Sequence, residues 1–353
     1  MKSSLGDLRR QVDLVLKSEI RRHGAVFREW KAQGIVEELE RSVFPGGKRI
    51  RPALCCLGYQ AAGGRLSQKI VRAAASLELL HTFALIHDDI MDASPERRGG
   101  PSAYRRAAGR FKSGEGINEP ERRGLSAAVL AGDLALVLSD RMFVESGFDA
   151  SDIARAWDPL TQMRLEAVGG QYLDLVTRGT PAGAPDGALT IAALKTAGYS
   201  VKGPMVFGAK LAGADEGRLA ALSAFGEKVG IAFQLADDLA GLLGDPAVTG
   251  KDAEADARRG SPTRLIAQTM QMASPSQRKT VRAIWGNPHC TAADLGKIRA
   301  LVVETGAVAA AVDEIKTMVS EASARLGQAK LKPGAVGMLC DLAGSIAAAA
   351  TMP

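Results

Sequence analysis

Three carboxylates end an apolar stretch of the chain. Asp88, Asp89 and Asp92 follow a long run of hydrophobic residues, and on a helix Asp88 and Asp92 share one face because they lie four residues apart. Like charges at this spacing destabilise a helix, so a positive partner is expected. Carboxylate oxygens suit Mg²⁺, which also takes water and phosphate oxygens. The pattern predicts either a metal and phosphate site or a solvated acidic helix end.

A second acidic pair has the same form. Asp237 and Asp238 also follow an apolar helical run, and Asp245 lies seven residues after Asp238 on nearly the same stripe. Carboxylates that interrupt an inward-facing apolar face need partners. The two acidic stretches could therefore converge on one metal cluster, or they could be two unrelated helix ends.

Two basic segments rich in glycine could supply those partners. The segment GGKRIRP at 46–52 places Lys48 and Arg51 at a predicted helix start, where backbone N–H groups favour phosphate. The segment RRGGP at 97–101 brings Arg97 and Arg98 within a few residues of the first carboxylates. Either segment alone is also typical of a solvated turn. Together they predict diphosphate binding, with metal ions between carboxylates and phosphate oxygens.

Further polar residues are weaker signals. His81 lies seven residues before Asp88, two turns along the same helix face, and could reach the cationic segments, although a lone histidine on an apolar helix is more often a core residue. The remaining candidates could each be ordinary surface residues: Gln171, Asp174, Lys195, Thr196 and Lys251.

Composition narrows the class of partner. The 353 residues are 46% hydrophobic and 24% charged, with 45 Lys and Arg against 39 Asp and Glu. The formal charge of +6 is compatible with nucleic acid, anionic lipid or phosphorylated metabolites. The cations form short clusters beside glycines, and only 5% of residues are aromatic, which disfavours nucleic acid. Phosphorylated metabolites are the expected partners.

The sequence also predicts a location. No stretch approaches the roughly twenty apolar residues of a membrane span, and charges interrupt the segment Met1–Ile20. Four cysteines, with Cys55 and Cys56 adjacent, form neither a disulfide framework nor a metal pattern. We expect a cytoplasmic protein without a transmembrane segment.

Helices must position these residues. Apolar residues recur at helical spacing nearly everywhere, and sustained alternation with period two is absent, which predicts an all-α chain. Gly203-Pro204 should kink or break the helix that carries Lys195. No repeat or long linker appears, so we expect one helical domain over residues 1–353, an antiparallel bundle. Breaks are expected at 45–47, 63–64, 94–102, 113–124, 179–187, 244–250 and 273–276.

The motifs, taken in order, resemble those of the trans-prenyltransferase family of isoprenyl diphosphate synthases. Between about residues 40 and 265 they are GGKRIRP, LELLHTFALIHDDIMD, RRGGP, GGQYLDL, KTAGY and FQLADDLAGLLGD. The resemblance implies the isoprenoid synthase fold, with antiparallel helices around a central cavity, usually in a homodimer. It also implies head-to-tail condensation of isopentenyl diphosphate with an allylic diphosphate.

The resemblance assigns a role to each candidate residue. Asp88, Asp92 and Asp237 would hold Mg²⁺, about three ions per active site, with Asp89 and Asp238 in support. The allylic substrate would contact Arg97, Lys195, Thr196, Gln234 and Lys251. Isopentenyl diphosphate would contact Lys48, Arg51, His81 and Arg98. Gln171 and Asp174 would complete the polar network near the metals.

Product length is a further expectation. Ala84 lies one turn before Asp88 and Phe83 lies beside it, a pair that resembles geranylgeranyl diphosphate synthases. The resemblance implies a mainly twenty-carbon product, with farnesyl or longer products as the alternative. Phe83 could equally be a core residue.

Two positions depart from the family pattern. The family usually has a Gly-Lys-x-Thr segment after the second acidic motif, where this chain has GSPT at 260–263. One phosphate-binding lysine is therefore missing, and Arg258, Arg259 or Arg264 could compensate. In the second acidic motif Gly241 stands at the fifth position, where the family usually has Asp.

Two rival functions share some of these features. A class I terpene cyclase also ionises an allylic diphosphate between two acidic helices, but it needs no isopentenyl site, and its pocket is usually more aromatic. A non-catalytic partner subunit of a prenyltransferase would account for the missing lysine. Such a subunit should have lost its first acidic motif, which this chain keeps.

Overall fold

Helices make up almost all of the regular structure. The computed structural model describes residues 5–111, 120–179, 185–244 and 253–351, and within them the strands are only two residues long. The predicted all-α class is confirmed. The chain forms two compact units, and each is described by itself. Unit 1 contains Met1–Cys56 and Arg65–Arg155, and unit 2 contains Leu57–Gly64 and Ala156–Pro353.

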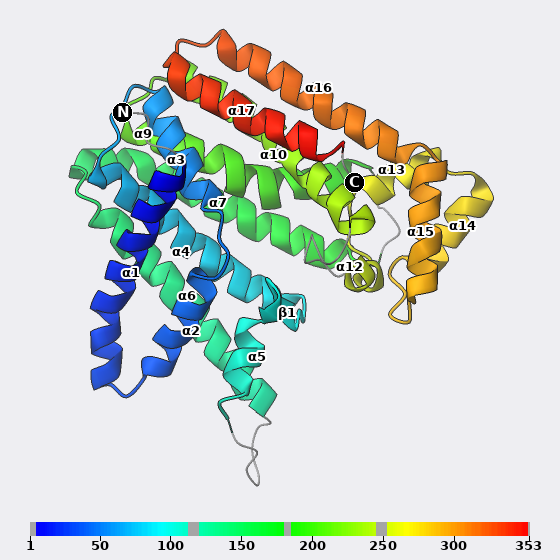
Figure 1. Ribbon diagram of the computed structural model, residues 1–353, viewed down its shortest axis with the longest axis horizontal. Helices are drawn as coiled ribbons and strands as arrows, with labels where there is room; N and C mark the ends of the chain where they lie inside the picture. Colours follow the sequence, from blue (N-terminus) through cyan, green and yellow to red (C-terminus); the bar gives the residue numbers. More distant parts are fainter. Residues whose placement is uncertain (1–4, 112–119, 180–184, 245–252, 352–353) are drawn as a thin grey trace. The chain divides into compact units, whose positions relative to one another are not determined.

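Unit 1 is built around α4, the helix that ends in the first acidic motif (Figure 1). α4 packs against four other helices of this unit, and its most extensive contact is with α6. The elements of unit 1 are α1 (Leu5–Glu29), α2 (Gln33–Val43), the first part of α3 (Ile50–Ala61), α4 (Gln68–Met91), β1 (Glu96–Arg97), β2 (Gly100–Pro101), α5 (Ala103–Ala108), α6 (Pro120–Val144) and the start of α7 (Ala150–Thr177).

Unit 2 is built around α10, which carries the second acidic motif. α10 packs against η1, α9, α13, α16 and α17. Besides the end of α3 and the rest of α7, the elements of unit 2 are α8 (Pro185–Ile191), the π-helix η1 (Ala192–Lys202), α9 (Gly203–Leu211), α10 (Glu216–Leu243), α12 (Ala253–Arg259), α13 (Arg264–Met272), α14 (Pro275–Ile284), α15 (Ala292–Glu304), α16 (Ala307–Gly327) and α17 (Pro333–Ala349).

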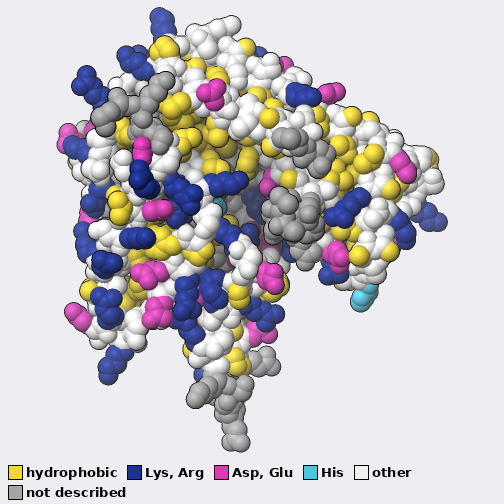
Figure 2. All heavy atoms as spheres, viewed as in Figure 1, with side chains coloured by type: hydrophobic (Ala, Val, Ile, Leu, Met, Phe, Trp, Pro, Cys, Tyr) yellow, Lys and Arg dark blue, Asp and Glu magenta, His cyan; other side chains and the backbone are white. Residues whose placement is uncertain are grey.

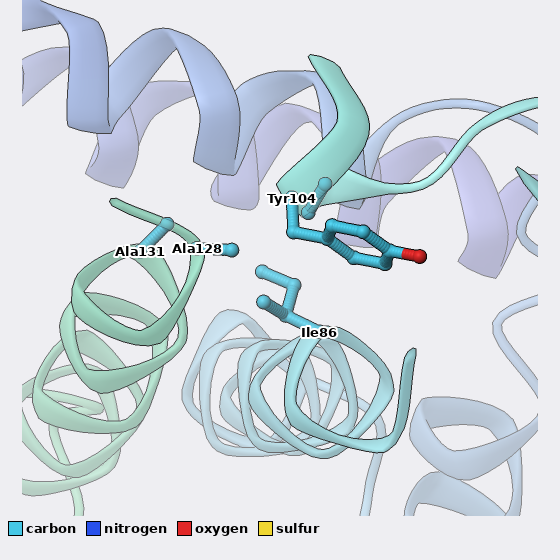
Figure 3. Packing of buried hydrophobic residues seen from close by; sticks show 5 residues of the cluster. Ile86, Tyr104, Ala128 and Ala131 are labelled. Carbon is cyan, nitrogen blue, oxygen red and sulfur yellow. The ribbon is translucent and has the colours of Figure 1, made fainter. Parts of the chain in front are cut away.

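Small residues on α6 let α4 and α5 approach closely. Ile86 of α4 packs with Tyr104 of α5 and with Ala128 and Ala131 of α6, and Figure 3 shows these side chains meeting in one cluster. At Gly132 a Cβ atom would overlap the imidazole of His87, so only glycine allows this contact. The cluster fixes the last turns of α4, which end in the carboxylates.

Glycines give α10 a comparable small face in unit 2. A Cβ atom at Gly226 would lie 2.6 Å from Lys202 Cα, and one at Gly230 would lie 2.6 Å from Ala197 Cβ. Both neighbours belong to η1. The close contact holds η1, with Lys195 and Thr196, against the helix that carries Asp237.

The predicted breaks coincide with helix ends, with three corrections. α6 begins at Pro120, α8 at Pro185 and α14 at Pro275, so helix occupies the last residues of the breaks expected at 113–124, 179–187 and 273–276. Proline fits these starts because its missing N–H would have no partner in a first turn. Other helix ends, such as Glu29, Val144 and Leu211, were not predicted. Gly203-Pro204 does end one helix type, since η1 gives way there to α9.

Two helices are longer and more apolar than the sequence analysis recognised. By length and composition alone α4 and α10 reach the range of a membrane-spanning helix, with a mean hydropathy of 1.2 over the most apolar window. In α4 67% of that window is buried inside the structure, and in α10 44%. Core helices reach the same range, and α4 packs as one in unit 1.

Charges of both signs are mixed on the surface. On the face shown in Figure 2, Lys and Arg side chains alternate with Asp and Glu over α1 and α2 at the lower left. Many of these charges are paired, as Arg22 is with Glu145 and Arg110 with Glu37. This part of unit 1 shows no continuous basic stripe of the kind that nucleic-acid binding requires.

Candidate active site

The three aspartates of the first motif have different environments. Asp89 is buried and accepts hydrogen bonds from the Arg97 guanidinium, with Nε 2.8 Å from Oδ1. Burial raises the pKa of Asp89, although the hydrogen bonds and charge of Arg97 act against this rise. Asp88 and Asp92 are only partly buried, and Asp88 Oδ2 lies 3.6 Å from Arg97 Nη2. Asp89 therefore orients Arg97, while Asp88 and Asp92 keep exposure to ligands.

A small hairpin separates the two arginines that follow. Arg97 pairs with Gly100 across β1 and β2, and the turn residues Arg98 and Gly99 have φ angles of 55° and 75°. Positive φ at both turn residues is the I′ form that suits two-residue hairpins. Successive residues of a strand and tight turn face opposite ways. Arg97 accordingly contacts the carboxylates of α4, whereas Arg98 Nη1 donates to Pro45 O at 2.5 Å.

A buried ion-pair network holds the GGKRIRP segment. Arg49 is 4% exposed and donates to Asp13 at 2.8 Å and to Glu78 at 2.6 Å. Its φ of 53° is unfavourable for a residue with a Cβ, so these partners must hold it. A Cβ at Gly47 would lie 2.9 Å from the Arg49 guanidinium carbon, which explains the glycine. The network fixes the backbone between the exposed side chain of Lys48 and the partly exposed side chain of Arg51.

His81 lies near the cations of both basic segments. Its burial, followed by the positive charges of Arg51, Arg98 and Arg97, lowers the pKa of His81 well below its usual value. Burial also lowers the pKa of Arg98; the charge of Glu78 acts against this fall, and the positive charges of Arg49, Arg97 and Arg51 add to it. Such mutual repulsion among cations favours an anionic ligand. Unit 1 thus brings together three of the four predicted isopentenyl contacts, Arg51, His81 and Arg98.

Phe83 and His87 form an edge-to-face pair on α4. Their ring centroids are 4.6 Å apart, and His87 Nε2 lies 3.1 Å from Val129 O of α6. Phe83 and Ala84 are both partly exposed, so neither is a fully buried core residue. Their positions agree with a role in contacting a growing chain.

In unit 2 one carboxylate oxygen accepts from two cations. Asp174 Oδ2 lies 2.8 Å from Lys195 Nζ of η1 and 2.8 Å from Arg178 Nη2. Burial alone would raise the pKa of Asp174, but the charge and hydrogen bond of Lys195, with those of Arg178, lower it. Asp174 is therefore ionised and holds both cations in place.

A second polar chain links η1 to α10. Thr196 Oγ1 donates to Gln234 Oε1 at 2.5 Å, and Gln234 Nε2 donates to Asp238 Oδ1 at 2.8 Å. Asp237, the neighbouring residue, is partly exposed. The π-helical winding of η1 is notable because π-helical turns are frequent at functional sites.

Asp88 and Asp92 fit a Mg²⁺ ion whose remaining ligands come from water and substrate. Among the described residues, no group of three or more His, Cys, Asp or Glu side chains is arranged to hold a metal ion by itself. Mg²⁺ typically takes one or two carboxylates and completes its shell with water and substrate phosphate. Asp88 and Asp92, one helical turn apart and partly exposed, match that requirement.

Lys251 and Asp245 lie outside the described residues. The three arginines proposed to replace the missing lysine are all engaged with carboxylates. Arg258 contacts Glu254 at 2.5 Å, Arg259 contacts Asp256 at 2.6 Å, and Arg264 lies 3.3 Å from Glu314.

Arg49, Glu78 and Arg178 belong to these clusters but were not predicted from the sequence. Arg49 and Glu78 form the buried pair behind Lys48 and Arg51, and Arg178 shares Asp174 with Lys195. Arg49 lies inside the GGKRIRP motif, and Glu78 lies three residues before His81 and so shares its side of the helix. Both positions could therefore have been recognised from the sequence. Arg178 gave no signal, because a single arginine after a helix is common.

Comparison with known proteins gives consistent matches. A sequence model of the family described as Polyprenyl synthetase matches residues 33–302. The chain is 30% identical over 268 residues to a geranylgeranyl diphosphate synthase of Sulfolobus acidocaldarius, covering 71% of each chain. It is 32% identical over 267 residues to a geranylfarnesyl diphosphate synthase of Aeropyrum pernix, covering 74% of this chain and 77% of the relative.

A solved structure extends the likeness to nearly the whole chain. The geranylgeranyl pyrophosphate synthase of Corynebacterium glutamicum, complexed with isoprenyl diphosphate and magnesium, is 33% identical, with a TM-score of 0.88. The match covers 97% of this chain and 99% of that one. The predicted isoprenoid synthase fold is confirmed. The relatives above are named for different prenyl products, so the comparison does not decide the length of this chain's product.

Proposed function

The chain belongs to the polyprenyl synthetase family, and from this premise we propose that it condenses isopentenyl diphosphate head to tail with allylic diphosphates, using Mg²⁺. The proposed main product is the twenty-carbon geranylgeranyl diphosphate. The substrates and product are acyclic diphosphates, in keeping with the clusters of cations and carboxylates.

The divergence of Arg97 and Arg98 supports this proposal best. One hairpin directs Arg97 to the carboxylates of α4 and Arg98 to the GGKRIRP turn. Two neighbouring anion-binding clusters suit an enzyme that holds two diphosphates at once. A terpene cyclase binds one diphosphate and would leave the cluster of Lys48, Arg51 and Arg98 without a ligand.

Asp88 and Asp92 in unit 1, and Asp237 in unit 2, are the proposed metal ligands. When bound, Mg²⁺ would stabilise the negative charge of the departing diphosphate. Arg97 and Lys195 would neutralise further phosphate charge through charge-assisted hydrogen bonds. Lys48, Arg51, His81 and Arg98 would hold isopentenyl diphosphate, whose alkene attacks the allylic cation before a proton is lost.

A product assay tests the proposed reaction. The protein is incubated with Mg²⁺, isopentenyl diphosphate and each of the five-, ten- and fifteen-carbon allylic diphosphates, and the products are identified by mass. We expect a prenyl diphosphate of mainly twenty carbons. Failure to condense any primer would refute the reaction, and a cyclic hydrocarbon would favour the cyclase.

Paired arginine variants test the roles of the two clusters. Arg98→Gln should raise the KM for isopentenyl diphosphate, and Arg97→Gln should raise the KM for the allylic substrate, because each loses a charged hydrogen bond to one diphosphate. Arg105→Gln, at an arginine paired with Glu121 on the surface, is the control. Equal effects of both variants on both KM values would contradict the assignment.

We also propose that two copies of the chain form a homodimer. On α6 Leu130, Val137 and Val144 recur every seven residues and are 56%, 62% and 52% exposed. On α7, within unit 2, a second set of large apolar side chains is exposed: Trp157, Leu165, Val168, Tyr172 and Val176. Apolar stripes of this kind typically mark contact surfaces between proteins.

A further inference from the structure

Two cationic side chains share one carboxylate oxygen near the end of α7. Asp174 is 8% exposed and its single oxygen Oδ2 accepts from both Lys195 and Arg178. The Arg178 side chain is 15% exposed and that of Lys195 is 31% exposed. The hydrogen bonds to Asp174 hold two cationic groups side by side, an arrangement that suits an anion with several oxygens.

The same face of α7 carries a donor in need of an acceptor. Gln171, Asp174 and Arg178 are spaced by three and four residues and so lie on one helical face. Gln171 Nε2 is buried, and no acceptor among the described residues is within hydrogen-bonding distance. A buried donor without a partner is unfavourable. An anionic oxygen beside this face would accept a hydrogen bond from Gln171 and would lie next to Lys195 and Arg178.

The backbone places Arg178 beside the segment that lacks the family's lysine. Gly179, with φ of 70°, follows Arg178, and its N–H donates to Gly260 O at 3.3 Å. Ser261 comes next in the chain and its carbonyl accepts from Trp285 Nε1 at 2.9 Å. The arginines of this segment are committed to Glu254, Asp256 and Glu314. The backbone contact thus places Arg178, the residue before Gly179, beside this segment.

We propose that Arg178 binds the diphosphate of the allylic substrate together with Lys195, in place of the cation that Ser261 does not supply. The inference rests on the proposed function and adds a residue to its diphosphate site. Asp174 holds the Arg178 guanidinium and the Lys195 ammonium group next to each other. A guanidinium can bind two phosphate oxygens at once, so it suits this task better than a single point charge.

Direct binding measurements test the role of Arg178. Titration calorimetry with inorganic diphosphate and Mg²⁺ compares the wild type with Arg178→Gln and Arg259→Gln. The loss of a charged hydrogen bond should weaken binding about ten- to a hundredfold in Arg178→Gln. Arg259→Gln, which removes the same charge from the GSPT side, should bind within about twofold of the wild type. Equal affinities for Arg178→Gln and the wild type would overturn the proposal.

Two further variants separate binding from structure. Arg178→Lys keeps a charge on Asp174 but cannot contact two phosphate oxygens, so we expect a loss of about fivefold with the fold intact. Should Arg178→Gln not fold, unchanged affinity of Arg178→Lys would overturn the proposal instead. Ser261→Lys added to Arg178→Gln should restore part of the affinity. Failure to restore it would refute the relation between Arg178 and Ser261.

Kinetics and binding together distinguish this inference from the proposed function. In Arg178→Gln the KM for the allylic substrate should rise, while the KM for isopentenyl diphosphate stays unchanged. If the wild type condenses no primer but diphosphate binding depends on Arg178, the proposed reaction fails and the diphosphate site stands. If condensation occurs and binding does not depend on Arg178, the reaction stands and this inference fails.

Discussion

Identical residue types within one motif have different tasks. Asp89 is buried against Arg97 and orients it, whereas Asp88 and Asp92 keep exposure. Spacing alone places Asp89 away from the shared face of the other two, but it does not reveal Arg97 as its partner. In unit 1 we therefore propose Asp88 and Asp92 as the metal ligands, with Asp89 in an indirect, orienting role.

The length of the product should depend on Phe83. Its ring is partly exposed and packs edge-on against His87, one turn closer to the carboxylates. Phe83→Ala should lengthen the product by at least one five-carbon unit, because the smaller side chain leaves room for further extension. Mass analysis of the products checks this. Leu85→Ala is the control, since position 85 faces a different side of α4, and an unchanged product in Phe83→Ala would exclude Phe83 as the limit.

His81 should make the stability of the protein depend on pH. Above pH 6.5 the imidazole is neutral in both the folded and unfolded states and contributes nothing. Below pH 6.5 the unfolded chain binds a proton that the folded protein resists, because burial and the nearby arginines lower the pKa of His81. The free energy of unfolding should therefore fall as the pH falls, by at most about 1.4 kcal/mol per pH unit.

Urea unfolding at pH 7.5, 6.5 and 5.5 measures this dependence. His81→Gln should have a shallower pH dependence than the wild type, whereas His289→Gln, at an exposed histidine, should keep the wild-type dependence. The same slope in His81→Gln and the wild type would show that the folded protein does not resist protonation at this site.

At the scale of helices and strands, the sequence predicted what depends on local pattern. Helical periodicity identified the class, glycine and proline identified several of the breaks, and the acids at 88 and 92 indeed share the end of α4. The hairpin at β1 and β2 was not expected, because two-residue strands are too short to show alternation. The π-helical form of η1 was also missed, since its residues have the same apolar spacing as an α-helix.

Long-range pairs are the part of the site that sequence patterns cannot reveal. Arg49 and Glu78 are 29 residues apart, and Lys195 and Asp174 are 21 residues apart. These pairs form only when separate helices pack together. The resemblance supplied Asp174 and Lys195 as separate site residues, but it supplied neither their ion pair nor Arg178, which belongs to no motif.

The packing of η1 against α10 should depend on Gly230. An alanine Cβ there would overlap Ala197 Cα and lie 2.6 Å from its Cβ, so the helices must separate. Gly230→Ala should lower the free energy of unfolding by about 1–3 kcal/mol. It should also weaken the hydrogen bond from Thr196 to Gln234. Urea unfolding and the KM for the allylic substrate measure the two effects.

Gly296 provides the matched control. It lies within α15 with no atom within 4 Å of an added Cβ, so Gly296→Ala should raise stability by roughly 0.5–1 kcal/mol through helix propensity. Equal stability changes at positions 230 and 296 would show that close packing of η1 on α10 is not what requires Gly230.

The residues that match the family model belong to both units. The matched residues, 33–302, contain the acidic end of α4 and the Asp174 cluster. Unit 1 contains the cluster around Arg97 and Arg98, and unit 2 contains the cluster around Asp174. A substitution in one of these clusters need not alter the other. The variants of Arg98 and Arg178 should therefore change affinity for different substrates.

Assembly of two chains is the prediction for the whole molecule. Val137 is 62% exposed at the centre of the stripe on α6, between Leu130 and Val144. A stable interface buries about 800 Å² on each partner, and a carboxylate placed at its centre would be costly to desolvate. Val137→Glu should weaken dimerisation at least about a hundredfold and give a monomer at micromolar concentration.

Sedimentation equilibrium of the wild type and Val137→Glu measures the change in association. Val303→Glu is the matched control, because Val303 on α15 is 60% exposed but does not belong to the α6 stripe. It should remain a dimer. A monomeric wild type would refute the homodimer, and a dimeric Val137→Glu would move the interface away from this stripe. In the second case the exposed apolar side chains of α7 become the candidate interface. Leu165→Glu tests them, because Leu165 is 62% exposed.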